Sequence, residues 1–542
     1  MNLKEELKKR IEIAIKNANI TFDEEKINIE VPKDKDNGDL STNIAMKIAV
    51  RNDKRPIEMA NEIADELRKE EIFDLVSVAQ PGFINIKFKK QYIYSNAFKV
   101  IDQDINYGRN NLGNNKKINI EYVSANPTGL LHLGTLRGGV YGDNLANIMK
   151  FCGYNVTREY YINDAGNQIS NLGKSIFVRY QELCGIKENM PEDGYYGKEI
   201  IDIAQIIYDE NKNNKLNESN EYFENIGVTT FLNKIKIDLS KVGIEFDVWT
   251  SEKEIREKGK IEESINELKK RNLLYENEGA IFLKTTEYGD DKDRVIIKTD
   301  KSYTYIMPDI AYHLDKINRG YDEIVDVLGT DHHGYISRLK ASVEALGYDK
   351  DKLTIKLLQL VRLIKDNQEV KMSKRTGETI KISELYDEIG KDAIRYFYSS
   401  RSLDCQMELN LDLITKKNNE NPLYYVQYAH ARICSIFKEA EKQKINIADK
   451  INNLNDEDSY NLLLKVYEFE DVVKVSAMNK EPHLITNYVY DLAALFHYYY
   501  SKEKILTEDT IASSEKLCII RAVKITISNA LNLIDVSAPE QM

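Results

Sequence analysis

Apolar positions through the middle of the chain alternate between a strand pattern and a helix pattern. Strand-like segments lie at 118–122, 155–160, 324–328 and 354–358. Apolar residues with helical spacing lie at 135–151, 308–318 and 335–346. Alternation of this kind predicts an α/β fold, in which a doubly wound parallel sheet binds a nucleotide beyond the carboxyl ends of its strands. Residues from about 165 to 290 are helix-rich and predict an insertion into this fold.

The two ends of the chain have different patterns. Residues 1–110 combine helical stretches with strand-like ones and predict a small N-terminal α+β domain, in which 81–88 alternates as an edge strand does and Pro56 opens a helix. Residues 401–542 predict an all-α helical bundle. Its expected helices lie at 423–437, 460–478, 482–500 and 513–533. The nucleotide-binding domain then spans 111–400.

The composition agrees with a large soluble protein of several domains. The 542 residues are 42% hydrophobic and 30% charged, and no apolar stretch reaches the roughly 18 residues that cross a bilayer. The 5 cysteines are scattered without a CxxC spacing, which argues against a disulfide framework or a zinc site. We therefore expect a cytoplasmic protein with no membrane contact and no protein-held metal. The net charge of −12 argues against indiscriminate nucleic-acid binding, but it does not exclude one selective RNA partner.

The first chemical signature follows the strand expected at 118–122. The run Asn126-Pro127-Thr128-Gly129 breaks that strand, and His132-Leu133-Gly134-Thr135 then leads into a helix. A glycine-containing turn between a strand and a helix presents unpaired N–H groups to an anion. His132 stands where its side chain can reach a phosphate, and Gly134 lacks the Cβ that would block a flat base.

A second signature lies about 240 residues further along, in Val370-Lys371-Met372-Ser373-Lys374-Arg375-Thr376-Gly377. Its three cations fall within five residues, and lysines are point-charge partners for polyphosphate. Neither signature is specific by itself, because a His before a Gly is common in turns and a basic loop is usually just solvated. In this order and on this scaffold, the pair predicts a nucleotide site.

The pair resembles the HIGH and KMSKS signatures of class I aminoacyl-tRNA synthetases. Residues 121–129, 158–168, 329–334 and 536–542 are similar to arginyl-tRNA synthetases in particular, and the resemblance spans essentially the whole chain. One position departs from the pattern, since Thr135 stands where the HIGH signature has its second His. A hydroxyl can still donate to a ribose or phosphate oxygen.

The resemblance implies roles for residues of both signatures. His132 would stabilise the charge that develops on the phosphate oxygens, and Lys371 and Lys374 would hold the β- and γ-phosphates. The implied catalytic residues are His132, Thr135, Lys371 and Lys374. The implied ATP ligands are His132, Gly134, Thr135, Asp331, His332, Lys371, Met372, Ser373 and Lys374. Mg²⁺ is expected with the pyrophosphate, bound mostly by phosphate and water.

Selection of arginine needs hydrogen-bond acceptors, because a guanidinium has five donors and no acceptor. The resemblance implies that the arginine ligands are Glu121, Asn126, Tyr305, Asp309 and His332. Tyr305 and Asp309 are four residues apart at a helix start, and hence on one face. A helix cap remains the alternative role for Asp309, and an ATP group remains the alternative partner of His332.

Taken together, these likenesses imply an ATP-dependent arginine–tRNA ligase. Arginine would react with ATP to give arginyl adenylate and pyrophosphate, and the 2′-hydroxyl of the 3′-terminal adenosine of tRNA(Arg) would take the arginyl group. We expect the N-terminal domain to contact the tRNA elbow, the insertion to support the acceptor stem and the bundle to bind the anticodon. Activation is expected to need bound tRNA, and the protein is expected to be a monomer.

Two alternatives to this function remain. A class I synthetase for glutamine, glutamate or cysteine would carry the same two signatures. A non-catalytic RNA-binding relative would keep the fold, although intact His132, Lys371 and Lys374 argue against it. The tyrosines at 424–428 and 498–500 invite an RNA-stacking role, but their helical spacing favours packing.

Overall fold

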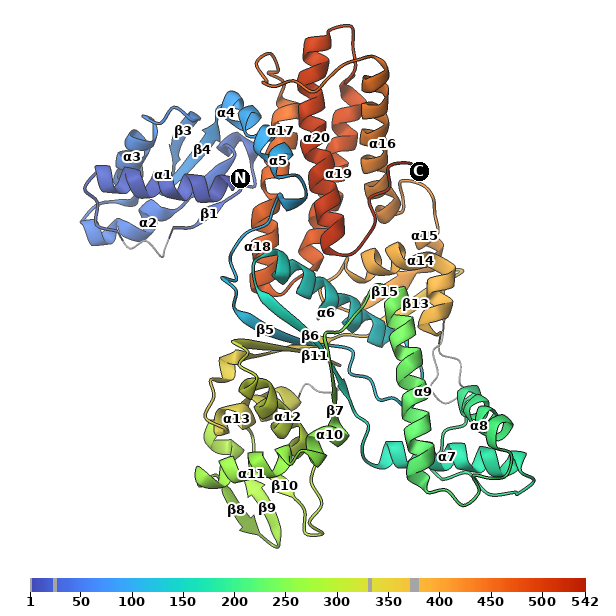
Figure 1. Ribbon diagram of the computed structural model, residues 1–542. Coiled ribbons are helices and arrows are strands. Elements are labelled where there is room, and N and C mark those ends of the chain that lie inside the picture. The colour runs from blue at the N-terminus through green and yellow to red at the C-terminus, as the bar shows by residue number, and fades with distance from the viewer. Residues whose placement is uncertain (1, 23–26, 330–333, 371–379) are drawn as a thin grey trace.

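The computed structural model describes residues 2–22, 27–329, 334–370 and 380–542. Figure 1 shows a small N-terminal unit, a central unit built on a sheet, and an upright helical bundle beside the C-terminus. The fold is therefore the α/β architecture with two flanking domains that the sequence predicts. Within the described ranges, no helix has both the length and the apolar character that a membrane crossing requires.

The N-terminal unit packs helices against a 4-stranded antiparallel sheet of order β1-β2-β4-β3. Its strands are β1 (Ile29–Glu30), β2 (Leu40–Thr42), β3 (Phe73–Ala79) and β4 (Phe83–Phe88). Its helices are α1 (Leu3–Asn17), α2 (Ile44–Ile48) and α3 (Pro56–Leu67), and Pro56 opens α3 as predicted. The prediction of an edge strand at 81–88 is wrong, because β4 bonds to β2 on one side and to β3 on the other.

The central unit carries a 5-stranded parallel sheet of order β12-β11-β5-β6-β7. The strands are β5 (Lys117–Glu121), β6 (Asn155–Ile162), β7 (Val248–Ser251), β11 (Glu323–Gly329) and β12 (Leu353–Leu358). Four of them confirm the strands predicted from the sequence. The fifth, β7, contains Trp249, which also stacks on Tyr160 with ring centres 4.5 Å apart.

Helices cover both faces of this sheet, as a doubly wound fold requires (Figure 1). Helix α6 (Leu133–Phe151) lies on one face, and α12 (Ile306–Asn318) and α13 (Tyr335–Ala345) lie on the other. The strand order reverses between β5 and β11. Ligands of such sheets bind at this reversal, beyond the carboxyl ends of the strands.

The region expected to be a helix-rich insertion has more than one part. Helices α7 (Asn167–Leu183), α8 (Lys198–Asn211) and α9 (Asn220–Lys241) come first, and the chain then returns to the central sheet at β7. Helices α10 (Glu252–Glu257) and α11 (Lys260–Lys270) lead into a 3-stranded antiparallel sheet. Its strands are β8 (Leu274–Asn277), β9 (Ala280–Leu283) and β10 (Arg294–Ile297). These strands have only 4 residues each, which is too short for alternation to be recognised.

The chain crosses a smaller sheet before it reaches the bundle. That sheet and its helices are β13 (Val361–Lys365), β14 (Gln368–Glu369), α14 (Ile382–Tyr398), β15 (Met407–Asn410) and α15 (Leu411–Ile414). The bundle helices are α16 (Pro422–Lys442), α17 (Glu457–Tyr467), α18 (Phe469–Asn479), α19 (His483–Lys502) and α20 (Thr510–Leu533). The single helix predicted at 460–478 is thus two helices, which meet at Glu468.

Buried polar contacts join the three units. Helices α4 (Lys90–Ser95) and α5 (Ala97–Gln103) connect the first unit to the second, and Tyr467 of the bundle donates to the carbonyl of Ile93 at 2.6 Å. Arg395 on α14 is fully buried and donates to Asp143 on α6 at 2.7 Å and to the carbonyl of Ile534 at 3.0 Å. Because these donors are buried, separating the units would be costly: the Tyr467 hydroxyl would lose its bond to Ile93, and Arg395 would lose its bond to Ile534.

Candidate active site

His132 is the N-cap residue of α6, so the first signature lies at a helix N-terminus. Its Nδ1 accepts from the backbone N–H of Thr135 at 3.4 Å, and the Thr135 hydroxyl lies 3.3 Å from Nε2. A Cβ added to Gly134 would lie 3.3 Å from the His132 ring. The His132 ring therefore lies in the space beside Gly134. The sequence interpretation, in which this space is left open for a flat base, did not include this contact.

The chain that follows the second signature lies against the first signature. Backbone atoms of His132 and Lys381 form an isolated antiparallel bridge. The ammonium of Lys381 also pairs with Glu199 on α8 at 2.7 Å. The predicted ATP ligands Lys371, Met372, Ser373 and Lys374 lie outside the described residues, as do Asp331 and His332.

Two paired strands end at the edge of the sheet where the first signature begins. Strand β5 ends at Glu121, ahead of the first signature, and β11 ends at Gly329. The order of the sheet reverses between these two strands. The first signature thus follows the position where a doubly wound sheet binds its ligand.

Two carboxylates among the predicted arginine ligands lie at this end of the sheet. Glu121 is 7% exposed, and its Oε1 accepts from the Ser124 hydroxyl at 2.8 Å. Asp309 lies in the first turn of α12, half-buried, and accepts from the Tyr335 hydroxyl. Burial raises the pKa of Asp309 to about 6, although the hydrogen bond from Tyr335 opposes that rise.

The other two described candidates lie in more open positions. Asn126 donates to Gln168 Oε1 at 2.7 Å. Tyr305 is the N-cap residue of α12 and is 91% exposed, with no side-chain cap hydrogen bond. Asp309 accepts from Tyr335 and not from a helix amide in the described structure, but its place in the first turn of α12 also suits the helix dipole, so the capping alternative stays open.

Sequence reasoning missed a buried ion network next to Glu121. Lys316 on α12 is fully buried and donates to Glu121 Oε2 at 2.5 Å and to Asp326 on β11 at 2.9 Å. His313 lies 2.7 Å from the second oxygen of Asp326. A signal was present, because charged residues at helical spacing interrupt an otherwise apolar helix face.

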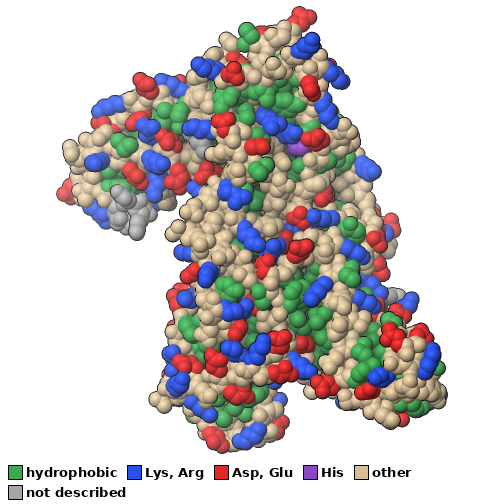
Figure 2. Space-filling view, viewed as in Figure 1, with side chains coloured by type: hydrophobic (Ala, Val, Ile, Leu, Met, Phe, Trp, Pro, Cys, Tyr) green, Lys and Arg blue, Asp and Glu red, His purple; other side chains and the backbone are tan. Residues whose placement is uncertain are grey.

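The bundle carries an aromatic and basic surface on α16 and α19. The rings of Tyr424 and Tyr428 are stacked 5.9 Å apart, and the Arg432 guanidinium lies over both Tyr428 and Tyr500, at 4.7 and 4.5 Å. Open grooves of about 930 and 1160 Å³ share Tyr428, Arg432 and Tyr500. In Figure 2, hydrophobic, Lys and Arg side chains gather on the bundle. Packing alone was expected for these tyrosines, but of 498–500 only Tyr499 is buried.

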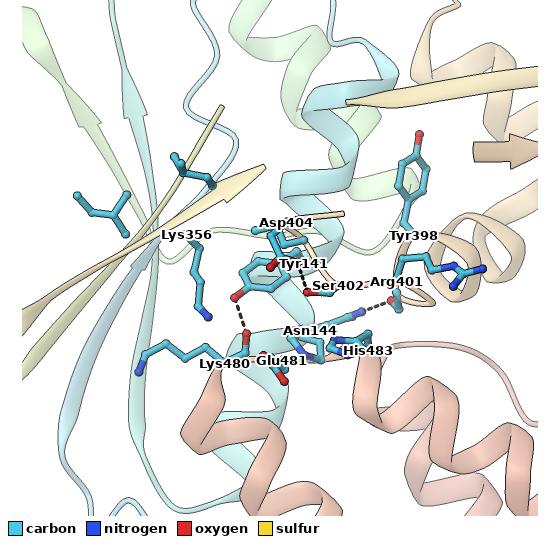
Figure 3. A pocket seen from close by; sticks show the side chains of 15 residues that line it. Tyr141, Asn144, Lys356, Tyr398, Arg401, Ser402, Asp404, Lys480, Glu481 and His483 are labelled. Carbon is cyan, nitrogen blue, oxygen red and sulfur yellow. Dashed lines mark hydrogen bonds between the residues drawn. The ribbon is translucent and has the colours of Figure 1, made fainter. Parts of the chain in front are cut away.

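A smaller cavity lies between the central unit and the bundle. Figure 3 shows Tyr141 and Asn144, from α6, and Lys356, from β12, around it, with Lys480 and His483 close by. Its volume is about 140 Å³, well below the roughly 300 Å³ at which ligand pockets begin. It contains none of the predicted site residues. We regard it as a packing gap at the joint.

The parallel sheet, the HIGH-like helix cap at its reversal point, and an aromatic and basic helical bundle define a class I aminoacyl-tRNA synthetase. Family models agree along the chain. "Arginyl tRNA synthetase N terminal domain" matches residues 5–88, "tRNA synthetases class I (R), catalytic domain" matches 98–402, and "DALR anticodon binding domain" matches 426–542.

Individual relatives show which family within this class the chain belongs to. The arginine–tRNA ligase of Bacillus subtilis is 44% identical over 550 residues, covering 100% of this chain and 99% of the relative. The arginine–tRNA ligase of Staphylococcus epidermidis is 46% identical with the same coverage. The chain belongs to the arginyl-tRNA synthetase family.

Solved structures support the same fold. A putative arginyl-tRNA synthetase from Campylobacter jejuni is 34% identical, with a TM-score of 0.77, and covers 84% of this chain and 100% of its own. The arginyl-tRNA synthetase of Thermus thermophilus has a TM-score of 0.77 over 100% of both chains at 18% identity. That likeness shows the fold alone.

Proposed function

We propose that this chain joins arginine to tRNA(Arg) with ATP, as a cytoplasmic monomer. The arginine carboxylate attacks the α-phosphorus of ATP, which releases pyrophosphate and leaves arginyl adenylate. A hydroxyl of the 3′-terminal adenosine of tRNA then attacks the arginyl carbonyl and releases AMP. The observation that carries this proposal is the pair of carboxylates, Glu121 and Asp309, beside the His132 helix cap on a chain of this family.

Arginine recognition rests on Glu121 and Asp309, with Asn126, Tyr305 and His332 as further ligands. A guanidinium presents donors in a plane, and two carboxylates offer acceptors that match it. The raised pKa of Asp309 reflects a burial cost that no Lys or Arg in the described part of the chain offsets. A bound guanidinium supplies that missing cation, which lowers the pKa again.

ATP is held at the N-terminus of α6 by His132, Gly134 and Thr135. Because Nδ1 of His132 accepts from the Thr135 N–H, the neutral ring carries its proton on Nε2. Nε2–H can donate to an α-phosphate oxygen, where negative charge grows in the transition state. The helix dipole favours the same charge. Lys371, Met372, Ser373, Lys374 and Asp331 complete the proposed ATP site, and the bridge between His132 and Lys381 supports this assignment.

Mg²⁺ is proposed to come with the ATP phosphates. Across the described ranges, no group of three or more His, Cys, Asp or Glu side chains could hold a metal ion. These residues therefore offer no cage for Mg²⁺, and we assign no step to a protein-bound metal. The ion would neutralise phosphate charge while water and phosphate complete its coordination.

The tRNA is proposed to contact all three domains, bounded at 1–110, 111–400 and 401–542, with the insertion at about 165–290. The N-terminal domain contacts the elbow, and the insertion supports the acceptor stem. The bundle surface at Tyr424, Tyr428, Arg432 and Tyr500 takes the anticodon, because bases stack on tyrosine and arginine faces.

Amino-acid-dependent exchange of pyrophosphate into ATP tests the proposal, run for each amino acid with and without tRNA(Arg). Arginine alone should support exchange, and only when tRNA is present. Lysine should fail because it leaves buried acceptors unpaired. Exchange with glutamine, glutamate or cysteine would contradict the assigned substrate. A folded protein that exchanges with no amino acid would favour a non-catalytic RNA-binding role.

A further inference from the structure

One face of α12 places ionisable side chains in the interior of the catalytic unit. Asp309, His313 and Lys316 stand at helical spacing on that face, among buried residues such as Ile310 and Leu314. His313 is 4% exposed, and Lys316 is 0% exposed. A lysine removed from water is costly unless its charge is paired. The position of Lys316 therefore needs a reason beyond packing.

The contacts of this face run without a break from one proposed arginine ligand to the other. Lys316 Nζ lies 2.5 Å from Glu121 Oε2 at the end of β5 and 2.9 Å from Asp326 Oδ1 on β11. The other Asp326 oxygen, Oδ2, lies 2.7 Å from His313 Nε2. His313 Nδ1 lies 2.7 Å from the backbone oxygen of Asp309. The relative placement of Glu121 and Asp309 is thus fixed through buried side chains.

The Glu121 carboxylate is fixed by two hydrogen bonds but can still accept others. Lys316 donates to Oε2, and the Ser124 hydroxyl donates to Oε1 at 2.8 Å. A carboxylate oxygen has two lone pairs, so both oxygens keep an acceptor position for another donor. An incoming guanidinium can therefore bond to Glu121 without displacing Lys316.

We propose that Lys316 is a positioning residue for arginine, which orients the Glu121 carboxylate and cancels its charge. The empty pocket then presents one uncompensated carboxylate, that of Asp309, to the one positive charge of the substrate. This inference rests on the proposed function, in which Glu121 and Asp309 accept from the guanidinium. It adds that Lys316 matches the charge of the pocket to the single positive charge of arginine.

The pKa shifts of the neighbouring groups agree with a charge-paired Glu121 and an unpaired Asp309. Burial alone would raise the pKa of Asp326, yet Lys316 and His313 hold it below its usual range. Burial alone would lower the pKa of Lys316, but Asp326 and Glu121 raise it. Asp309 has no Lys or Arg partner in the described structure, and its pKa is raised to about 6. The other titratable groups acting on these residues include Glu159 and Tyr161 of β6, Glu252 of α10, Tyr312 of α12 and Tyr335 of α13.

Loss of Lys316 would change the way in which the pocket titrates. The charge of Glu121 would then act on Asp309 without the ammonium that offsets it, while His313 stays bonded to Asp326. The pKa of Asp309 would rise further, and its carboxyl would hold a proton nearer to neutral pH. Arginine would have to expel that proton to bind, so its affinity would fall at a higher pH than in the parent protein.

The test compares full-length variants in tRNA charging across about pH 5.5 to 8.5. Lys316→Met removes the ammonium. The double variant Lys316→Met with Asp326→Asn also removes the Asp326 charge that the ammonium pairs, so Asp326 is not left as a buried carboxylate facing the lost ammonium and the fold is protected. Either change should raise the arginine KM about 10- to 100-fold, leave the ATP KM within about twofold, and move the acid limb of arginine use to higher pH. Lys316→Arg should restore most of the loss.

Arg319→Met is the matched control. Arg319 is the C-cap residue of α12, but it pairs with Glu159, at 2.8 Å, and not with a proposed arginine ligand. This variant should lower the melting temperature without moving the acid limb.

Three results would overturn the inference. These are an unchanged arginine KM in the folded double variant, equal losses for arginine and ATP, and the same shift of the acid limb in Arg319→Met. The Glu121→Gln variant tests the proposed function separately from the role of Lys316. An unchanged arginine KM in that variant would remove Glu121 from recognition altogether. A large arginine-specific loss there, with none in the Lys316 variants, would reject the role of Lys316 alone.

Discussion

Lowering the pH should weaken the use of arginine before it weakens the use of ATP, because Asp309 loses its charge first. Burial raises the pKa of this carboxyl to about 6, and a guanidinium binds its ionised form. The ionised share falls from about ten elevenths at pH 7 to about one eleventh at pH 5. The arginine KM should therefore rise about tenfold between these two pH values.

The same shift affects stability, and its sign can be worked out. The pKa of Asp309 in the folded protein, about 6, lies above its ordinary value of 3.8, so the folded state keeps a proton that the unfolded state loses. Stability from this group is therefore greatest below the unfolded pKa and falls as the pH rises towards 6. Arginine relieves this cost at neutral pH. Its addition should raise the melting temperature more at pH 7 than at pH 5.

Asp309→Asn supplies the perturbation for this prediction. The amide has one acceptor, and its NH₂ repels the guanidinium donors, so arginine use should worsen by about 2–5 kcal/mol while ATP use changes little. The dependence on pH between about 5 and 7 should flatten, and the arginine-free variant should melt no lower than the parent at pH 7. Initial charging rates and thermal melts measure these effects. A flat profile in the parent would refute the assigned pKa, and equal changes in both KM values would give Asp309 a structural role.

Three further variants test the ATP and tRNA sites. His132→Ala should slow pyrophosphate exchange by about two to three orders of magnitude with little change in melting temperature, and a rate close to that of the parent would reject the HIGH-like assignment. Thr135→His should be tolerated because it restores the family pattern, whereas a folded but inactive variant would mean that the contact between Thr135 and His132 is required. Tyr428→Ala with Arg432→Ala should raise the KM for tRNA(Arg) at least about tenfold, and an unchanged tRNA KM would remove this surface from anticodon binding.

Point variants of the bundle test its role more sharply than removal of residues from about 420 onward. The buried Arg395 guanidinium donates to the carbonyl of Ile534, and Tyr141 of α6 donates to the carbonyl of Lys480 at 2.6 Å. Truncation would remove both carbonyl acceptors and leave the Tyr141 hydroxyl and one guanidinium N–H of Arg395 without these bonds inside the catalytic unit. Loss of charging by a truncated protein could then come from misfolding as well as from lost tRNA contacts.

Most of the catalytic sheet could be predicted from the sequence because its strands are rich in β-branched and aromatic residues. Strands β5, β6, β11 and β12 are of this kind. Strand β7 and the antiparallel strands β8 to β10 have 4 residues each, so neither periodicity nor length separates them from loops. The central position of β4 depends on its partners β2 and β3, and pairing of this kind leaves no mark in the periodicity of one strand.

The candidate site was predicted where its chemistry lies in local motifs. His132 was proposed from the turn that surrounds it and Asp309 from the family resemblance, and both lie at helix starts. Lys316 could not be found in this way, because its partner Glu121 is 195 residues away in the chain. Its burial results from the packing of α12 onto the sheet, and the only hint in the sequence is the charged spacing on that helix face.

The central claim is that Glu121 and Asp309 select arginine at the carboxyl end of the sheet. A crystal structure of the protein with arginine bound tests it most directly. The account predicts guanidinium nitrogens within about 3 Å of oxygens of both carboxylates, with Lys316 still bonded to Glu121. A guanidinium bound elsewhere, with Asp309 still paired only with Tyr335, would contradict the account.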